Sequence, residues 1–164
     1  MISLTPVIDR LRTASVGRAK LPAQLPWFRQ VEGAAAFARV ASLPQVPLPG
    51  CWVVRAAEQS APAGERRSVV TVAFDVVIGI TNHRIASAGD SDDVLLAYRL
   101  AVLAELQELR DLPGLVDAIE RKGGSVIEYA EGDLWWRDQY TCAVAVTNYL
   151  PDPPAFDRIT NTNP

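Results

Sequence analysis

The chain has 164 residues, the usual size of one domain, and a chain of this length buries roughly 70% of the surface that it exposes when unfolded. Its formal net charge is -3, which argues against a basic field that would attract nucleic acid. No apolar run approaches the roughly eighteen residues of a membrane span, and the charged N-terminus is unlike a signal peptide, so we expect a soluble protein made in the cytoplasm.

The N-terminal third predicts two helices separated by irregular chain. Residues 3–14 have apolar side chains at helical spacing, with polar residues on the opposite side. Prolines interrupt residues 18–31, which we expect to be irregular. An alanine-rich helix is expected at residues 33–41, and the prolines of residues 43–50 favour an extended connector.

A strand and a loop are expected next. Residues 51–57 predict a strand, because they form a short apolar run. From Glu58 to Glu65 there is no apolar period, and the segment contains a proline and a glycine. We therefore expect a long mobile hairpin loop there, after which Arg66 and Arg67 begin regular structure again.

A long strand at residues 67–82 is the segment around which we expect the rest of the chain to pack. Its even positions are large and apolar: Val70, Val72, Phe74, Val76, Ile78 and Ile80. Side chains alternate between the faces of a strand, so this face should lie on the core. The other face is mixed, and its main members are Val69, Thr71, Asp75 and Val77. That face is a candidate contact with a second copy of the protein.

The strongest helix signal covers residues 91–110. Asp92 and Asp93 lie in its first turn, where the helix dipole favours negative charge. Its apolar stripe consists of Leu95, Tyr98, Val102, Leu106 and Leu109, flanked by Leu96 and Leu103. We expect this stripe to cover the apolar face of the central strand, and Glu105 to face away from it.

The C-terminal part predicts a hairpin and a tail. Residues 125–130 and 134–148 alternate in the manner of strands and are separated by a turn. Residues 151–164 have too few apolar side chains to order themselves, so residues 1–150 should form the single domain. The order helix, helix, strand, strand, helix, strand, strand predicts an α+β fold, with a mostly antiparallel (mixed) sheet and the helices packed on one face.

The sequence contains little that points to catalysis, a cofactor or a metal ion. His83, the single histidine, has no nucleophile motif beside it and is more typical of a surface residue. The acidic residues at 90–93 could bind a hard metal ion, but helix capping explains them without one. Cys51 and Cys142 lie in apolar runs and are expected to be reduced and buried. We expect a protein that is not an enzyme.

Trp135, Trp136 and Arg137 directly follow the predicted turn. Adjacent residues of a strand point to opposite faces, so one tryptophan leaves the core unless something covers it. Tryptophan and arginine are also enriched at interface hot spots. Two interpretations stay open: a contact with a partner, or one tryptophan in the core and one shielding the rim of the sheet.

Five stretches of residues 1–150 form a recognisable series: LTPVIDRLRTA, GAAAFARVASLP, VTVAFDVVIGITN, DSDDVLLAYRLAVLAELQELRDL and GDLWWRDQYTCAVAVTNYL. Together, over roughly residues 1–150, they resemble the family of phage tail terminators. The resemblance implies a structural virion protein of the tail-neck region, assembled in the host cytoplasm. It would form a homohexameric ring on the major tail tube protein, stop tube polymerisation and provide the attachment surface for the head-tail connector or neck protein. DNA would pass through the ring without sequence-specific binding.

On this hypothesis, contacts with partners or other copies are expected at thirteen positions. They are Glu58, Glu65, Arg66, Arg67, Val69, Thr71, Asp75, Val77, Trp135, Trp136, Arg137, Phe156 and Arg158. The loop and the tail would become ordered on neighbouring proteins. Two alternatives remain: a head-tail connector or completion protein of similar fold, and a small-molecule-binding α+β domain, which would require a pocket with convergent polar groups.

Overall fold

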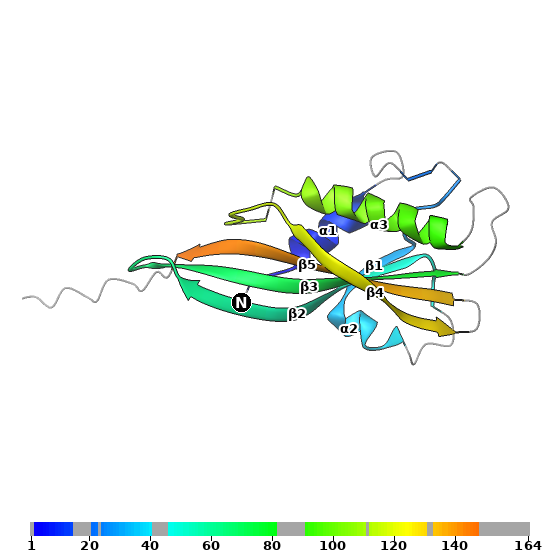
Figure 1. Cartoon of the computed structure of the whole chain (residues 1–164), viewed down its shortest axis with the longest axis horizontal. Helices are drawn as coiled ribbons and strands as arrows, with labels where there is room; N and C mark the ends of the chain where they lie inside the picture. The colour runs from blue at the N-terminus through cyan, green and yellow to red at the C-terminus, as the bar shows by residue number, and fades with distance from the viewer. Residues whose placement is uncertain are drawn as a thin grey trace, which may run out of the picture.

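The computed structural model describes residues 2–14, 21–22, 24–40, 46–81, 91–110, 112–130 and 133–147. They form a five-stranded mixed sheet with helices on both faces (Figure 1). The elements are α1 (Thr5–Thr13), β1 (Gln30–Gly33), α2 (Ala34–Phe37), β2 (Gly50–Pro62), β3 (Arg67–Thr81), α3 (Ser91–Gln107), β4 (Glu120–Ala130) and β5 (Asp133–Thr147). The predicted α+β class and order are confirmed, with the short strand β1 as an addition between the first two helices.

The sheet is built around β3, as the alternation of apolar residues predicted. The strand order is β1-β2-β3-β5-β4, and β3 pairs antiparallel with β5 along its whole length. All six even positions from Val70 to Ile80 are buried in the main core. The short strand β1 pairs in parallel with the start of β2, from Gln30↔Gly50 to Gly33↔Val53.

Helices α1 and α3 lie on one face of the sheet and cover the main core (Figure 1). The predicted apolar stripe of α3 is buried there. The expectation that Glu105 faces away is wrong: it is 1% exposed, and Arg10 of α1 lies 2.6 Å from it. The apolar stripe predicts a single buried side for α3, but the packing of α3 against α1 buries a second one.

Helix α2 lies on the opposite face, so the expectation that the helices share one face holds for α1 and α3 but not for α2. There Leu48, Trp52 and Val77 are buried in a second apolar cluster, with Phe37 of α2 packed against them. The ring of Trp52 lies 6.1 Å from Phe37 and 5.2 Å from Trp135 of β5, centroid to centroid. This part of the sheet is therefore covered on both faces.

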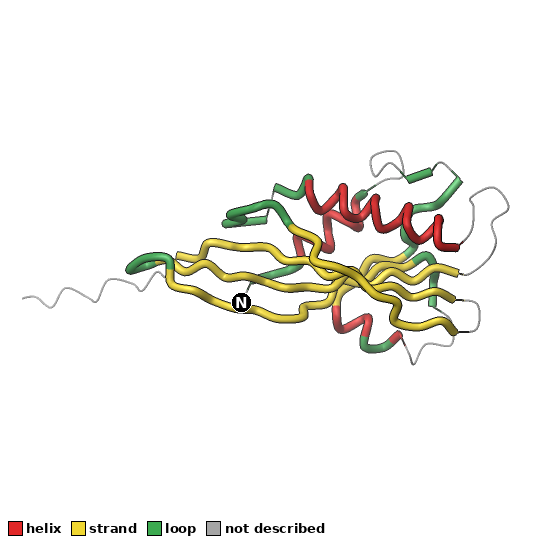
Figure 2. Tube along the Cα trace, in the orientation of Figure 1, coloured by secondary structure: helices red, strands yellow, loops and turns green. Residues whose placement is uncertain are grey.

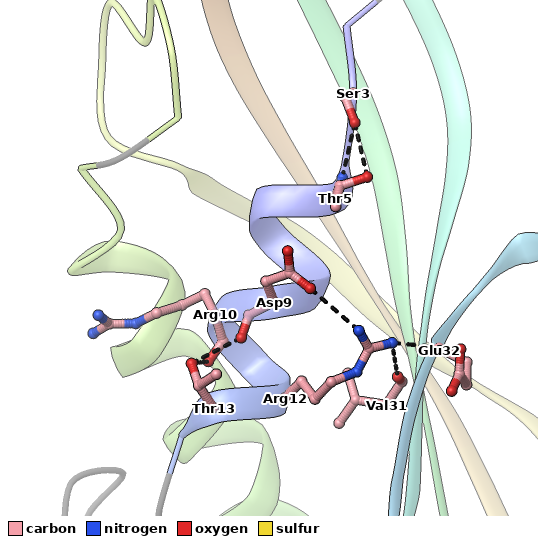
Figure 3. A network of polar contacts seen from close by, with 8 residues as sticks. All are labelled: Ser3, Thr5, Asp9, Arg10, Arg12, Thr13, Val31 and Glu32. Atoms are coloured by element: carbon pink, nitrogen blue, oxygen red, sulfur yellow. Dashed lines mark hydrogen bonds and ion pairs between the residues drawn. The ribbon is translucent and has the colours of Figure 1, made fainter.

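Polar contacts fix α1 to the edge of the sheet (Figure 3). Arg12 donates a hydrogen bond of 3.0 Å from Nη2 to the carbonyl oxygen of Val31 in β1. The same guanidinium group lies 3.2 Å from Asp9 and 3.5 Å from Glu32. Arg10, on another side of the helix, points toward α3. Two arginines of α1 thus connect it to both of its neighbours.

The hairpin of β2 and β3 is longer than predicted, and the expected loop at residues 58–65 is wrong. Strand β2 continues to Pro62, paired with Ser68, and the turn occupies residues 63–66. Gly64 adopts φ 133°, a conformation that favours glycine. The side chains of this segment do not alternate between apolar and polar. Its backbone nevertheless forms hydrogen bonds with β3, and these make it a strand.

We call residues 57–62 of β2, 67–73 of β3 and 141–147 of β5 the arm. Its strands extend past the helices at one end of the molecule (Figures 1 and 2). Residues 112–116 run beside β5 here, with a hydrogen bond of 2.7 Å from Ala145 N–H to the carbonyl of Gly114. Gly114 has φ 76°, and a Cβ atom at this position would lie 2.5 Å from the Ala145 oxygen, so the close approach requires glycine.

Candidate interaction surface

A buried carboxylate joins β5 to α3 and β4. Asp138 is 0% exposed. Arg99 of α3 donates hydrogen bonds of 2.9 and 3.1 Å to its two oxygens, and Arg121 of β4 donates two of 2.9 and 2.8 Å to Oδ1. Trp136 Nε1 donates a further one of 3.0 Å. Three elements are therefore fixed to one side chain.

The charge state of Asp138 follows from these contacts. Burial alone raises the pKa of its carboxyl group, because the charged form loses solvation. Hydrogen bonds from Arg99, Trp136 and Arg121 outweigh this effect and hold the pKa below its usual range. Asp138 is therefore ionised at neutral pH, and it compensates the charges of Arg99 and Arg121, whose side chains are partly covered.

Strand β4 approaches this carboxylate closely because Gly124 has no side chain. A Cβ atom there would overlap Asp138 Oδ1 and lie 2.7 Å from Trp136 Nε1. At the neighbouring Gly123 a Cβ atom would meet no atom within 4 Å. The two glycines thus differ: Gly124 is required by the Asp138 contacts, whereas Gly123 is not.

Both tryptophans of the predicted pair have partners within the chain. The guanidinium carbon of Arg99 lies 4.1 Å from the centroid of the Trp136 ring, at the rim of the main core. Trp135 packs on Trp52 in the second cluster. The geometry favours the structural interpretation of this pair, with the difference that α2 and Trp52 cover the face that seemed to lack a core.

Val77 does not belong to the exposed surface that the alternation predicted. It is 2% exposed beneath α2, so it does not reach another copy, and we remove it from the candidate contacts. Asp75, on the same face, is partly covered, and Arg137 lies 3.9 Å from it. Burial raises the pKa of Asp75, and Arg137 and Gln139 offset this only in part.

The other candidate residues within the described ranges lie on the arm or in the turn at its end. Glu58 forms an ion pair with Arg55 of the same strand. Glu65 and Arg66 are exposed in the turn, and Arg67 is the first residue of β3. Val69 and Thr71 point to the face of the arm away from α1 and α3. Phe156 and Arg158, like His83 and Asp90, lie outside the described residues.

We call the face of the arm that contains Val69 and Thr71 its outer face. Cross-strand pairing places these side chains on it: Ala57, Gln59 and Ala61 of β2, Val69, Thr71 and Ala73 of β3, and Thr141, Ala143, Ala145 and Thr147 of β5. All ten are exposed or half-exposed and uncharged, whereas Arg67, which pairs with Thr147 at the end of the arm, places a charge on the same face. None of them belongs to the second cluster under α2.

A group of exposed apolar residues was missed by the sequence reasoning. Among the described residues, the large apolar side chains that are exposed are Leu96, Leu100, Val116, Val126 and Ile127. All five lie on α3, on β4 or between them. A signal was present, because leucines at 96, 100 and 103 have the spacing of a second helical stripe outside the buried one.

The described residues contain no cluster of three or more potential metal-ligating side chains. No helix among them is long and apolar enough to cross a membrane. A shallow depression of about 410 Å³ is lined by Gln30, Glu32, Ala36 and Arg39, none of which is a predicted contact. Cys51 and Cys142 are free and buried as expected, and burial raises the pKa of both thiols.

Comparison with known families agrees with the resemblance seen in the sequence. The family described as phage tail terminator protein matches residues 1–150. The chain therefore belongs to the phage tail terminator family. It is a structural protein of the phage tail, which associates with other tail or neck proteins. A search of curated proteins gave no match.

Proposed function

We propose that this protein ends the phage tail tube. Copies of it form a ring, a homohexamer in our proposal, on the last ring of the major tail tube protein. The ring stops tube polymerisation and offers its other side to the head-tail connector or neck protein. The observation that supports this proposal most is the family match, which spans every described helix and strand.

The end of the arm is our candidate contact with the neighbouring tail protein. It presents Glu65, Arg66 and Arg67, which are exposed at a point that projects beyond the helices (Figure 1). Exposed charges of this kind orient an encounter and set its rate more than they add affinity. We propose that Phe156 and Arg158 contribute to contacts with neighbouring proteins as well. The lumen passes DNA without sequence-specific binding, in keeping with the net charge of -3.

The first test is the mass of the purified full chain, measured by native mass spectrometry with and without tube protein. A ring that binds tube ends is the expected result. A strict monomer that neither binds tube ends nor limits tube length would contradict the proposal. Pull-downs with tube protein and with the connector separate it from a connector or completion protein, which would bind the head side alone.

A second test addresses the arm. The double variant Arg66→Glu, Arg67→Glu should weaken binding to tube ends and leave ring mass unchanged, because both side chains are exposed. The matched control is Arg29→Glu, Arg110→Glu, an equal charge change at exposed positions away from the arm. Equal binding by both variants would show that the end of the arm makes no contact with the tube.

A further inference from the structure

Exposed apolar residues lie on α3 and on β4, two elements that are joined through Asp138. Leu96 and Leu100 lie one turn apart on α3 and are 47% and 57% exposed. Val126 of β4 pairs with Trp136, over which Arg99 of α3 lies, so α3 and β4 meet at this point. We call Leu96, Leu100, Val126 and Ile127 the apolar ridge. The charge of Arg99, which lies beside the ridge, is directed inward to Asp138.

A second surface, which no described helix covers, lies on the opposite face of the sheet. The outer face of the arm presents Gln59, Ala61, Val69, Thr71, Ala143 and Ala145, which pair across three strands. These residues are uncharged and mostly short, with Arg67 at the end of the same face. A face of short side chains and a ridge of large ones are complementary in side-chain size, and burial of both removes apolar surface from water.

The edges of the sheet are less suited to a contact than its faces. Strand β2 has a register shift between Arg55 and Ala57, and it ends at Pro62, which has no N–H to donate. Arg55 also donates a hydrogen bond to the carbonyl of Ile2, which brings the N-terminal segment to this edge. Strand β4 has two register shifts. Bulges and proline at an edge oppose the addition of another strand.

The placement of the two surfaces decides between two kinds of contact. A two-fold contact of α3 with α3 would cover the ridge but leave the outer face of the arm exposed. A head-to-tail contact covers both surfaces at once, because they face opposite sides of the molecule. Repeated head-to-tail contacts close into a ring when the rotation between copies allows it.

We infer that the outer face of the arm of one copy packs on the apolar ridge of the next copy. This inference rests on the proposed ring and specifies the surfaces that build it. The occupant of the ridge is thus a second copy of this chain, and its arm reaches the ridge because it projects past the helices (Figure 2).

Disulfide trapping in the full chain tests the contact directly. The double variant Thr71→Cys, Leu100→Cys, assembled in the presence of tube protein and mildly oxidised, should give a ladder of covalent oligomers on a non-reducing gel. Each single variant and the wild type, whose Cys51 and Cys142 are buried, should give no ladder. Covalent dimers from Leu100→Cys alone would show an α3-to-α3 contact, and cross-links to tube protein would show another occupant; either result overturns the inference.

A charge placed on the ridge provides the second test. Leu100→Glu should reduce the ring to monomers while the unfolding midpoint stays close to that of the wild type, because Leu100 is 57% exposed. The matched control Gln107→Glu adds the same charge at an exposed position of the same helix and should retain the ring. A Leu100→Glu ring of normal mass refutes the contact but leaves the proposed function standing. A monomeric wild type without affinity for tube ends refutes the proposed function itself.

Discussion

Replacement of Asp138 by asparagine tests the buried network most sharply. The variant keeps the shape of the side chain but removes the charge that compensates Arg99 and Arg121. Asp138 is 0% exposed and accepts five hydrogen bonds, four from arginines and one from Trp136. The amide group of asparagine would also turn a donor toward guanidinium groups that donate. We therefore expect folding to be destabilised, with α3 and β4 both affected.

The size of the effect follows from the burial of the partners. Removal of one member of a buried ion pair costs about 3–5 kcal/mol, because the other charges remain covered and unpaired. Arg99 and Arg121 are 19% and 33% exposed, so water compensates part of this loss. We expect a loss of about 3 kcal/mol in the free energy of unfolding, a large part of the 5–15 kcal/mol typical of a domain. The melting temperature should fall by roughly 6–12 °C.

The effect should depend on pH in a defined direction. The pKa of Asp138 is lower in the folded than in the unfolded chain, so its contribution is present above the unfolded pKa of about 4 and disappears as the pH falls through the folded pKa. Asp75→Asn is the matched control. Burial raises the pKa of Asp75, so its ionised form opposes folding above that pKa, and the variant should be neutral or stabilising at pH 7.

Urea denaturation followed by tryptophan fluorescence measures both variants, at pH 7 and again near pH 3. The difference between wild type and Asp138→Asn should be large at pH 7 and should shrink in acid. Equal stabilities of wild type and Asp138→Asn at pH 7 would refute the reasoning. So would an Asp75→Asn variant that loses as much stability as Asp138→Asn, because the two carboxylates would then not differ in the way their contacts require.

Four further variants test individual contacts by the same denaturation assay. Tyr140→Phe should be neutral or slightly stabilising, because the buried hydroxyl of Tyr140 has no hydrogen-bond partner among the described residues; a loss above about 1 kcal/mol would show a missing partner. Gly124→Ala should cost about 1–3 kcal/mol through its overlap with Asp138, whereas Gly123→Ala should change little, and the reverse order would contradict the geometry of β4. Val77→Asp should unfold or strongly destabilise the chain, because it places a charge in the second cluster; a stable variant that fails only in assembly would restore Val77 to the interface.

The helices and strands whose apolar residues repeat at a regular spacing could be predicted from the sequence. The alternation from Val70 to Ile80 identified the central strand and its core face, and the helical spacing from Leu95 to Leu109 identified α3 and the face it covers. These predictions succeed because the repeat of apolar side chains that marks a buried face lies within one short segment of the sequence.

The errors arose where tertiary contacts override a local pattern. Residues 58–62 lack an apolar period, yet pairing with β3 makes them a strand. The face covered by α2 was missed, although the run Cys51 to Val54 is apolar at every position, which is typical of a strand buried on both faces. Glu105 is buried because α1 supplies Arg10, and the sequence does not show which helix lies beside it.

The contacts of Asp138 are a further feature that a local sequence pattern does not reveal. Asp138 is in phase with the inward-facing Tyr140 and Cys142 of β5, so a charge at a core position was visible in the sequence. Its two arginine partners are 39 and 17 residues away on two other elements, which no local period connects. The contact residues stay a prediction: those on the arm are exposed or half-exposed, whereas Val77 is buried and Trp135 packs in the second cluster. The apolar ridge is not among the predicted contacts.

The length of tail tubes assembled in vitro tests the central claim most directly. Tube protein is polymerised with increasing amounts of this protein, and tube lengths and ends are recorded by electron microscopy. Our account predicts shorter tubes with a ring of additional density at one end. Tubes of unchanged length with bare ends, at concentrations where the purified protein is folded, would contradict it.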